Sequence, residues 1–296
     1  MSAVVNDALG TRKAARRTRW WRDLSWRYLV AVVAIAYAAF PIVFVISASL
    51  SQRGTLSGTS GLFTSVTTLQ YEALFQTYFG QWMLNSLIIG GVSAVGTVLM
   101  AAAAAYAFSR FRFKGRRNAL TFLLLLQMFP QLLAFVAILL LLLALGNAIP
   151  VLGLNSRAAL IAVYLGGALG ANTFLMYGFF NSVPRELDEA ARIDGASHSR
   201  IFFTIILRLV APVLAVVALL SFVGSFSDFI IARVVLTQQS QLTVAVGLYQ
   251  FVSGQFDARW GIFAAGAVLA SIPIVVLFQF LQRYIVGGLT AGAVKG

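Results

Sequence analysis

Side chains that could take part in acid–base chemistry are concentrated in residues 182–208. This segment contains the single His of the chain, His198, and four of its nine acidic residues: Glu186, Asp188, Glu189 and Asp194. One His among scattered carboxylates provides no convergent catalytic set. The chain has no Cys, which excludes disulfides and thiolate ligands, and a single His argues against a multi-His metal site. We therefore predict no catalytic residue, bound cofactor or metal ligand, and interpret His198 as a solvated loop residue.

The spacing within this segment predicts a short helix, a glycine turn and a second helix. Pro184 suits a first helical turn, and the acidic residues after it complement the positive end of the helix dipole. Gly195 can adopt the left-handed conformation that ends a helix. Four residues at helical spacing share one face: Leu187, Ala190, Ala191 and Asp194. Because alanines let another surface approach closely, we interpret this face as a docking face, with an amphipathic helix resting on the membrane as the alternative.

The elements that must position this segment are apolar. Hydrophobic residues make up 60% of the 296 residues and charged residues 10%, against roughly 25% charged in soluble domains; the mean hydropathy is +0.88. An uncharged run of about 20 residues is what a helix needs to cross a bilayer. We predict an all-α, polytopic membrane protein with six transmembrane helices, at Tyr28–Leu50, Trp82–Phe108, Asn118–Leu145, Ala158–Asn181, Leu209–Ala232 and Trp260–Gln282. The first run exceeds a signal-peptide core of ~7 to 15 residues, so an uncleaved anchor is favoured.

Basic residues predict the topology. The net charge of +13 does not indicate nucleic-acid binding, because Lys and Arg cluster at the ends of apolar runs. One side of the predicted membrane collects 18 of them and the other side 4, which places both termini in the cytoplasm. The predicted parts are a basic interfacial helix at 1–27 that turns into the first span, a six-helix domain at 28–282 with external loops at 51–81 and 233–259, and a cytoplasmic tail at 283–296.

The predicted spans contain few ionisable groups. Asp228 is the single acidic residue within them, and we interpret it as an interfacial carboxylate that is solvated or locally paired. Ion-coupled carriers usually keep ionisable residues deep in their helices, so the pattern argues against one. Uncharged polar residues, including Asn172, Ser225 and Ser227, are candidates for a solute path. Hydrogen bonding between helices is the alternative for each of them.

The segment 182–208 resembles the EAA loop of bacterial ABC import permeases. The resemblance is carried by Glu189, Ala190, Ala191, Asp194 and Gly195, followed by Ile205 and Leu207. It implies that the first helix is a coupling helix, seated in a cleft of a separate ATP-hydrolysing subunit. The family pattern usually has Pro after the last Leu, where this chain has Arg208.

The wider chain resembles the MalG-like permeases of maltose-type importers. The matching segments are Gln127–Pro130, Leu242–Gly247 and Gly288–Gly296. The resemblance implies that the tail, with Gly292 and Lys295, contacts the paired ATPase subunits. It also implies that the loop Tyr249–Asp257 faces an extracytoplasmic sugar-binding protein, through Tyr249, Gln250, Ser253, Gly254 and Gln255.

The chain has no G-x-x-x-x-G-K-[ST] phosphate loop, so ATP and Mg²⁺ are expected on a partner ATPase dimer. The resemblance implies a permease subunit of a binding-protein-dependent importer in the bacterial inner membrane, paired with a second homologous permease. Its expected substrates are maltose and maltodextrins, with trehalose or another α-glucoside as the alternative. An ion-coupled secondary carrier is the alternative from a different class.

Overall fold

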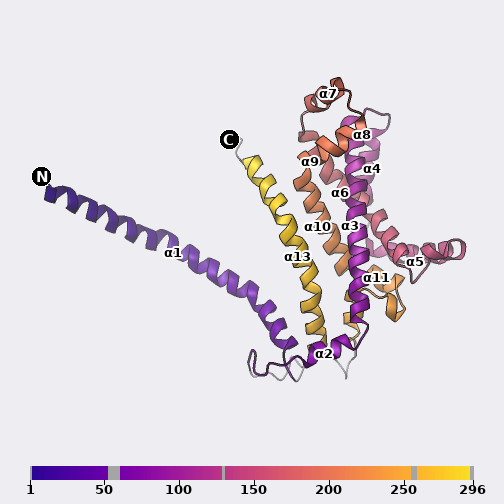
Figure 1. Cartoon of the computed structure of the whole chain (residues 1–296), viewed down its shortest axis with the longest axis horizontal. Coiled ribbons are helices and arrows are strands. Elements are labelled where there is room, and N and C mark those ends of the chain that lie inside the picture. Colours follow the sequence, from indigo (N-terminus) through magenta and orange to yellow (C-terminus); the bar gives the residue numbers. More distant parts are fainter. Residues whose placement is uncertain (1, 53–60, 129–130, 255–258, 294–296) are drawn as a thin grey trace.

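The computed structural model describes residues 2–52, 61–128, 131–254 and 259–293, and these contain helices but no strand (Figure 1). The α-helices are α1 (Ser2–Ser49), α2 (Leu69–Phe75), α3 (Phe79–Arg110), α4 (Arg116–Gln127), α5 (Gln131–Ala148), α6 (Arg157–Ser182), α7 (Glu186–Ile193), α8 (His198–Arg200), α9 (Leu207–Leu209), α10 (Ala211–Ser227), α11 (Ile230–Val235), α12 (Val244–Tyr249) and α13 (Trp260–Ala293). A π-helical segment, Ile201–Ile206, joins α8 to α9, and short 3₁₀ turns lie at Pro150–Leu152 and Gln239–Gln241. The all-α class is confirmed.

Four described helical segments are long and apolar enough to cross a membrane. They are Ser25–Ser49 within α1, α3, α6, and Trp260–Ile285 within α13. Each coincides with a predicted span to within three residues at either end, because long apolar runs report span positions directly. The segment α8–α9 together with α10 forms a fifth, bent candidate.

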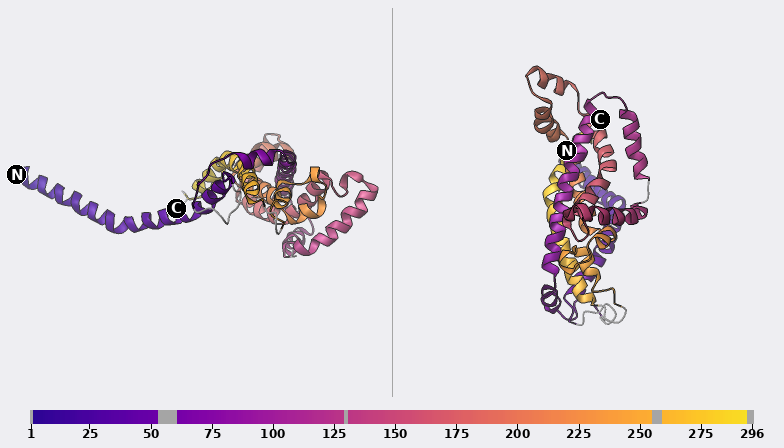
Figure 2. Two further views of the ribbon diagram at one scale, coloured as in Figure 1. Left: turned by 90° about the horizontal axis from the view of Figure 1, so that it is seen from below. Right: turned by 90° about the vertical axis from the view of Figure 1, so that its right-hand side faces the viewer.

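The third predicted span is not one continuous helix. It divides into α4 and α5, and Pro130, where a kink was expected, lies outside the described residues. Helix α4 runs alongside α6, whereas α5 lies across the direction of α3 (Figures 1 and 2). Hydropathy reports how apolar a run is and not its direction, which is why the division was not predicted.

The fifth predicted span, Leu209–Ala232, is also wrong in its bounds. Helix α10 ends at Ser227, Asp228 has extended backbone, and α11 begins at Ile230. At the other end, the segment His198–Leu209 meets α10 at an angle of 81°. Pro212 occupies the first turn of α10, where its missing N–H breaks no helical hydrogen bond. The bend is therefore present even though this chain has Arg208 at the position where the family pattern has Pro.

Both terminal helices are longer than predicted. Helix α1 is continuous from Ser2, so the expected turn between an interfacial helix and the first span is absent. No Gly or Pro occurs between residues 11 and 40 to interrupt it. Helix α13 likewise continues through residue 283 to Ala293.

The bundle is built around α3, which packs along α6 and α10. Helix α13 packs on α10. The C-terminal end of α1 lies near α2 and contacts α13, whereas its N-terminal end points away from the other helices (Figure 1). None of the residues in the most apolar 18-residue window of α1 is buried within the chain. Buried side chains form two clusters, one at each end of the bundle. The cluster at the α7 end includes Tyr106, Met176, Phe180, Ile201 and Phe202.

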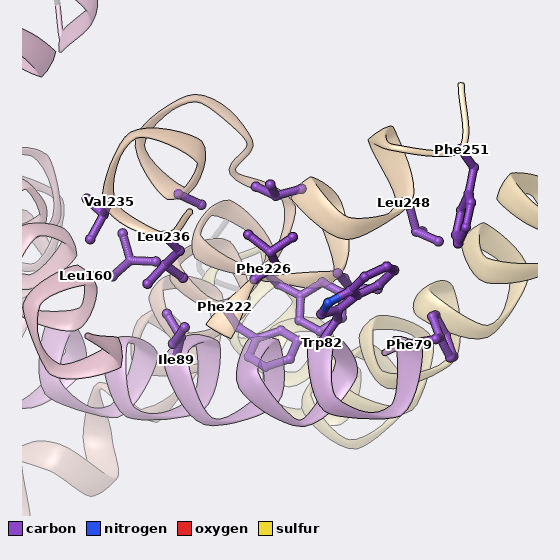
Figure 3. Packing of buried hydrophobic residues seen from close by; sticks show 14 of the residues in the cluster. Phe79, Trp82, Ile89, Leu160, Phe222, Phe226, Val235, Leu236, Leu248 and Phe251 are labelled. Carbon is purple, nitrogen blue, oxygen red and sulfur yellow. The ribbon is translucent and has the colours of Figure 1, made fainter. Parts of the chain in front are cut away.

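The described parts of the predicted external loops pack against the bundle. Helix α2 lies in the first loop, and the second loop contains α12, whose Val244, Val246 and Leu248 are buried. Trp82 on α3 fixes the second loop, because its Nε1 donates a 2.7 Å hydrogen bond to the Gln239 carbonyl. Figure 3 shows Trp82 among the aromatic and aliphatic side chains of the other cluster, at the end of the bundle away from α7. The sequence alone did not reveal this burial, because polar residues interrupt the loop.

Candidate functional site

The helix–turn–helix predicted for residues 182–208 is present. Helix α7 ends in a paired set of backbone hydrogen bonds, from Gly195 N–H to the Arg192 carbonyl and from Ala196 N–H to the Ala191 carbonyl, each 2.9 Å. Gly195 has φ of +79°, the left-handed conformation that this pattern requires. The turn is therefore closed and well defined, so that α7 is held at a fixed angle to the chain that follows.

The second helix begins with a side-chain cap. Ser197 Oγ accepts a hydrogen bond from Arg200 N–H at 3.3 Å, which satisfies one of the free donors at a helix start. The π-helical segment follows, and the bend into α10 follows that. Segments of this kind often mark functional positions. The chain thus runs from the glycine turn through this bend directly into α10.

The predicted docking face of α7 is partly directed inward. Ala191 is half-buried against the cluster at this end of the bundle. Asp188, which lies one turn before Ala191 and was not part of the predicted face, is buried. Leu187 and Ala190 are exposed, as are Glu189, Asp194 and Gly195. Ile193 is 87% exposed, the highest value among the large apolar side chains of the described residues. Sequence reasoning missed Ile193, although its position one turn after Ala190 was the signal that could have found it.

A buried ion pair joins α7 to α3, and sequence reasoning missed it. Arg110 Nε lies 2.6 Å from Asp188 Oδ2, and the two side chains are 3% and 5% exposed. Arg110 also donates from Nη2 to the Val183 carbonyl at 3.0 Å. In the reverse direction, Arg185 Nη2 donates to the Ser109 carbonyl at 2.9 Å. The end of α3 and the start of α7 are therefore fastened by contacts from both sides.

Aromatic rings extend this connection into the second helix. Tyr106 lies one turn before Arg110 on α3, and its ring centroid is 5.1 Å from that of Phe202. Phe111, directly after Arg110, packs edge-on against His198 at 5.1 Å. His198 remains solvent-exposed, which fits its interpretation as a loop residue. Helix α3 thus contacts both arms of the helix–turn–helix.

The residues predicted to face a binding protein lie at the opposite end of the bundle. Tyr249 is 47% exposed, and its ring packs 4.7 Å from that of Phe229. Gln250 Oε1 accepts a 3.1 Å hydrogen bond from Gln239 Nε2. Ser253 and Gly254 are exposed, and Gln255 lies outside the described residues. The four described residues therefore form part of one accessible surface beyond α12.

The candidate solute-path residues make local hydrogen bonds. Asn172 donates to the Ala168 carbonyl at 2.9 Å, and Ser225 donates to the Ser221 carbonyl at 2.8 Å, each within its own helix. Ser227 is exposed at the end of α10. Among the hydrogen bonds of the described residues, none joins these three side chains to one another. Their assignment to a solute path stays a prediction.

Residues 97–290 match the model of a family described as "Binding-protein-dependent transport system inner membrane component". The chain belongs to this family of transport permeases. The matched range contains α7 with its glycine turn, both residues of the Arg110–Asp188 pair and the surface beyond α12. It ends before Gly292 and Lys295.

Named relatives resemble the permease along almost its whole length. The galactooligosaccharides transport system permease protein GanQ of Bacillus subtilis (strain 168) is 41% identical over 96% of this chain and 99% of its own. The maltodextrin transport system permease protein MdxG of the same organism is 40% identical over 91% of this chain and 95% of its own. A crystal structure of a bacterial ABC transporter that imports the polysaccharide alginate has a similar chain, with TM-score 0.73, 21% identity, and coverage of 90% and 98% of the two chains. It establishes likeness of fold.

The tail of the permease is only partly described. Gly292 lies in the last turn of α13, and Lys295 lies outside the described residues. Helix α13 ends at the same end of the bundle as α7 (Figure 1). The family match makes the chain a multi-pass membrane component, and its tail stays a predicted contact.

Proposed function

We propose that this permease is the translocation subunit of an ABC importer for maltodextrin-type sugars, and that α7 is its coupling helix. The observation that carries the proposal is the short helix α7, which presents the exposed side chain of Ile193 and ends in the left-handed turn at Gly195. Such a helix can enter a cleft on another protein while its geometry stays fixed. Figure 2 shows that α7 projects beyond the ends of the membrane helices.

The proposed partners follow from the family. They are a second, homologous permease, an ATPase dimer that binds ATP and Mg²⁺, and an extracytoplasmic sugar-binding protein. The accessible surface beyond α12, with Tyr249 and Gln250, is the proposed contact with the binding protein, and α7 together with the tail is the proposed contact with the ATPases. The permease itself makes and breaks no covalent bond; it moves solute as its helices rock as near-rigid bodies between two states.

The proposed location is the bacterial inner membrane with both termini in the cytoplasm. The support is the 18-to-4 distribution of basic residues. The common position of α7 and the end of α13 at one end of the bundle agrees with it.

Sugars of the maltodextrin type are favoured because one relative is a maltodextrin permease. A second relative is named for galactooligosaccharides, so that class belongs in the same test as trehalose and other α-glucosides. An ion-coupled carrier is the competing class. It is disfavoured because Asp228, the one acidic residue in the predicted spans, is already bonded to Tyr164 and to the backbone of Ala232.

The proposal is tested by assembling the permease with its partners in proteoliposomes. Maltotriose presented by the binding protein is expected to accelerate ATP hydrolysis and to enter the vesicles; trehalose and a galactooligosaccharide are the comparison sugars. Uptake that needs no ATP and stops when an ionophore dissipates the ion gradient would contradict the proposal. Because the chain has no Cys, Ile193→Cys provides a unique thiol, which is expected to cross-link to the ATPase subunit and not to the binding protein.

A further inference from the structure

Helix α3 neither directly precedes nor directly follows the helix–turn–helix in the chain. The chain enters α7 from α6 and leaves it, through Gly195 and the bend, toward α10. Yet α3 packs along both α6 and α10 and is the central helix of the bundle. A displacement of α7 therefore reaches α3 directly only through the non-covalent contacts at its last turn.

Those contacts are close and shielded from water. Arg110 Nε lies 2.6 Å from Asp188 Oδ2 and the pair is almost completely shielded from water, so the attraction between the two charges is stronger than in an exposed pair. Arg110 is also held by the Val183 carbonyl, and Arg185 reaches back to the Ser109 carbonyl. These two hydrogen bonds prevent α7 from turning or sliding freely about the ion pair.

Stability alone is a weak explanation for a buried ion pair. Removing two charges from water costs about as much as their attraction returns, and well-packed apolar residues often serve as well. Here the hydrogen bonding is incomplete: Arg110 Nε, Asp188 Oδ1 and the Tyr106 hydroxyl are buried without a hydrogen-bond partner among the described residues. A contact with unused hydrogen-bonding capacity suits a position where the geometry must change between two states.

We infer that the Arg110–Asp188 ion pair is the link that transmits movement of α7 to α3, and that Arg110 is a positioning residue for coupling ATP hydrolysis to transport. The inference rests on the proposed function, since it assigns a task to a residue behind the docking helix and not to the docking surface itself. Arg110 is buried within the chain, and it acts through Asp188.

The test measures sugar transported per ATP hydrolysed in assembled transporters, reconstituted with the binding protein and labelled maltotriose. Arg110→Gln and Asp188→Asn are each expected to lower this ratio at least fivefold while ATP hydrolysis continues. The double variant is expected to be no worse than either single variant, because the two residues act as one unit. Arg112→Gln, which changes an exposed arginine two residues from Arg110, is expected to leave the ratio unchanged.

A purely structural role would lower the yield of assembled complex and leave the ratio per complex intact, and that result would overturn the inference. The apolar pair Arg110→Met with Asp188→Leu guards against misfolding, since such replacements are commonly tolerated. It is expected to assemble but to hydrolyse ATP with little transport. Normal coupling by this pair, or its failure to assemble, would also overturn the inference. Absence of ATP-dependent transport in the unaltered complex would instead refute the proposed function.

Discussion

The Tyr164 hydroxyl on α6 donates a 2.8 Å hydrogen bond to Asp228 Oδ2, and the same oxygen accepts a 2.9 Å bond from the Ala232 N–H. The carboxylate thus fastens α6 to the break between α10 and α11 and caps the start of α11. This confirms the local pairing that was one of the two interpretations of Asp228.

Replacing Tyr164 with Phe removes the side-chain half of this arrangement. Hydrogen bonds to charged groups contribute about 1.5–3 kcal/mol, so we expect a lower unfolding temperature for Tyr164→Phe in detergent. Tyr78→Phe, at an exposed tyrosine, is the matched control and is expected to show no shift. Equal unfolding temperatures for both variants would contradict the role of the bond.

Substitution of Gly195 should separate coupling from insertion. A residue with a Cβ in the left-handed region costs about 1–2 kcal/mol, and a β-branched residue is worse, so Gly195→Val is expected to reach the membrane in normal amounts but to block uptake. Gly195→Asn should be milder, because Asn tolerates this conformation.

Gly178→Val is the matched control for Gly195→Val, because it adds the same side chain at a glycine that is not in the left-handed conformation. Gly178 lies in α6, where an added Cβ would meet no atom within 4 Å and the backbone φ is not positive. This variant is expected to retain uptake. Full uptake by Gly195→Val at normal ATP consumption would count against the coupling role of the turn.

Gly247 is required by the close approach of α12 to α3. A Cβ at this position would lie 2.2 Å from the Trp82 ring, which is incompatible with the observed packing. Gly247→Ala is expected to destabilise the fold by about 1–3 kcal/mol, the usual cost of overpacking, and to change Trp fluorescence. Gly91→Ala, where nothing lies within 4 Å, serves as the control. A Gly247→Ala protein as stable as Gly91→Ala would show that α12 can move aside freely.

Ile193 should matter for association and not for folding. Its side chain packs on almost nothing within the chain, so Ile193→Ser is expected to change the stability of the permease by no more than about 0.5 kcal/mol. Co-purification of the ATPase is expected to fall sharply. Ile230→Ser, at an exposed residue near the opposite end of the bundle, is the control for co-purification. Retention of the ATPase by the Ile193 variant would argue that another part of α7 makes the contact.

The features that were predicted from the sequence depend on neighbouring residues. The turn at Gly195 and the helices on either side of it follow from signals within a few positions, and four spans follow from uninterrupted apolar runs. Both kinds of signal act locally along the chain.

The features that were missed depend on residues distant in sequence. Arg110 and Asp188 each read as an ordinary charged residue next to a helix end; only the packing of α3 against α6 brings them together. The same holds for Trp82, whose indole binds the loop before α12. For Asp228 the pairing was predicted but its partner, Tyr164 on α6, was not. The direction of α5 was missed because composition does not encode the angle at which a helix leaves a turn.

The right-angled corner between His198–Leu209 and α10 has a mechanical consequence. At 1.5 Å per residue a segment of this length is roughly 18 Å long. It therefore acts as a lever arm attached at 81° to α10. A push of about 1 Å at its far end, normal to the arm, corresponds to a swing of roughly 3° for an arm of that length. A small displacement at the far end of this arm is thereby converted into torque on α10.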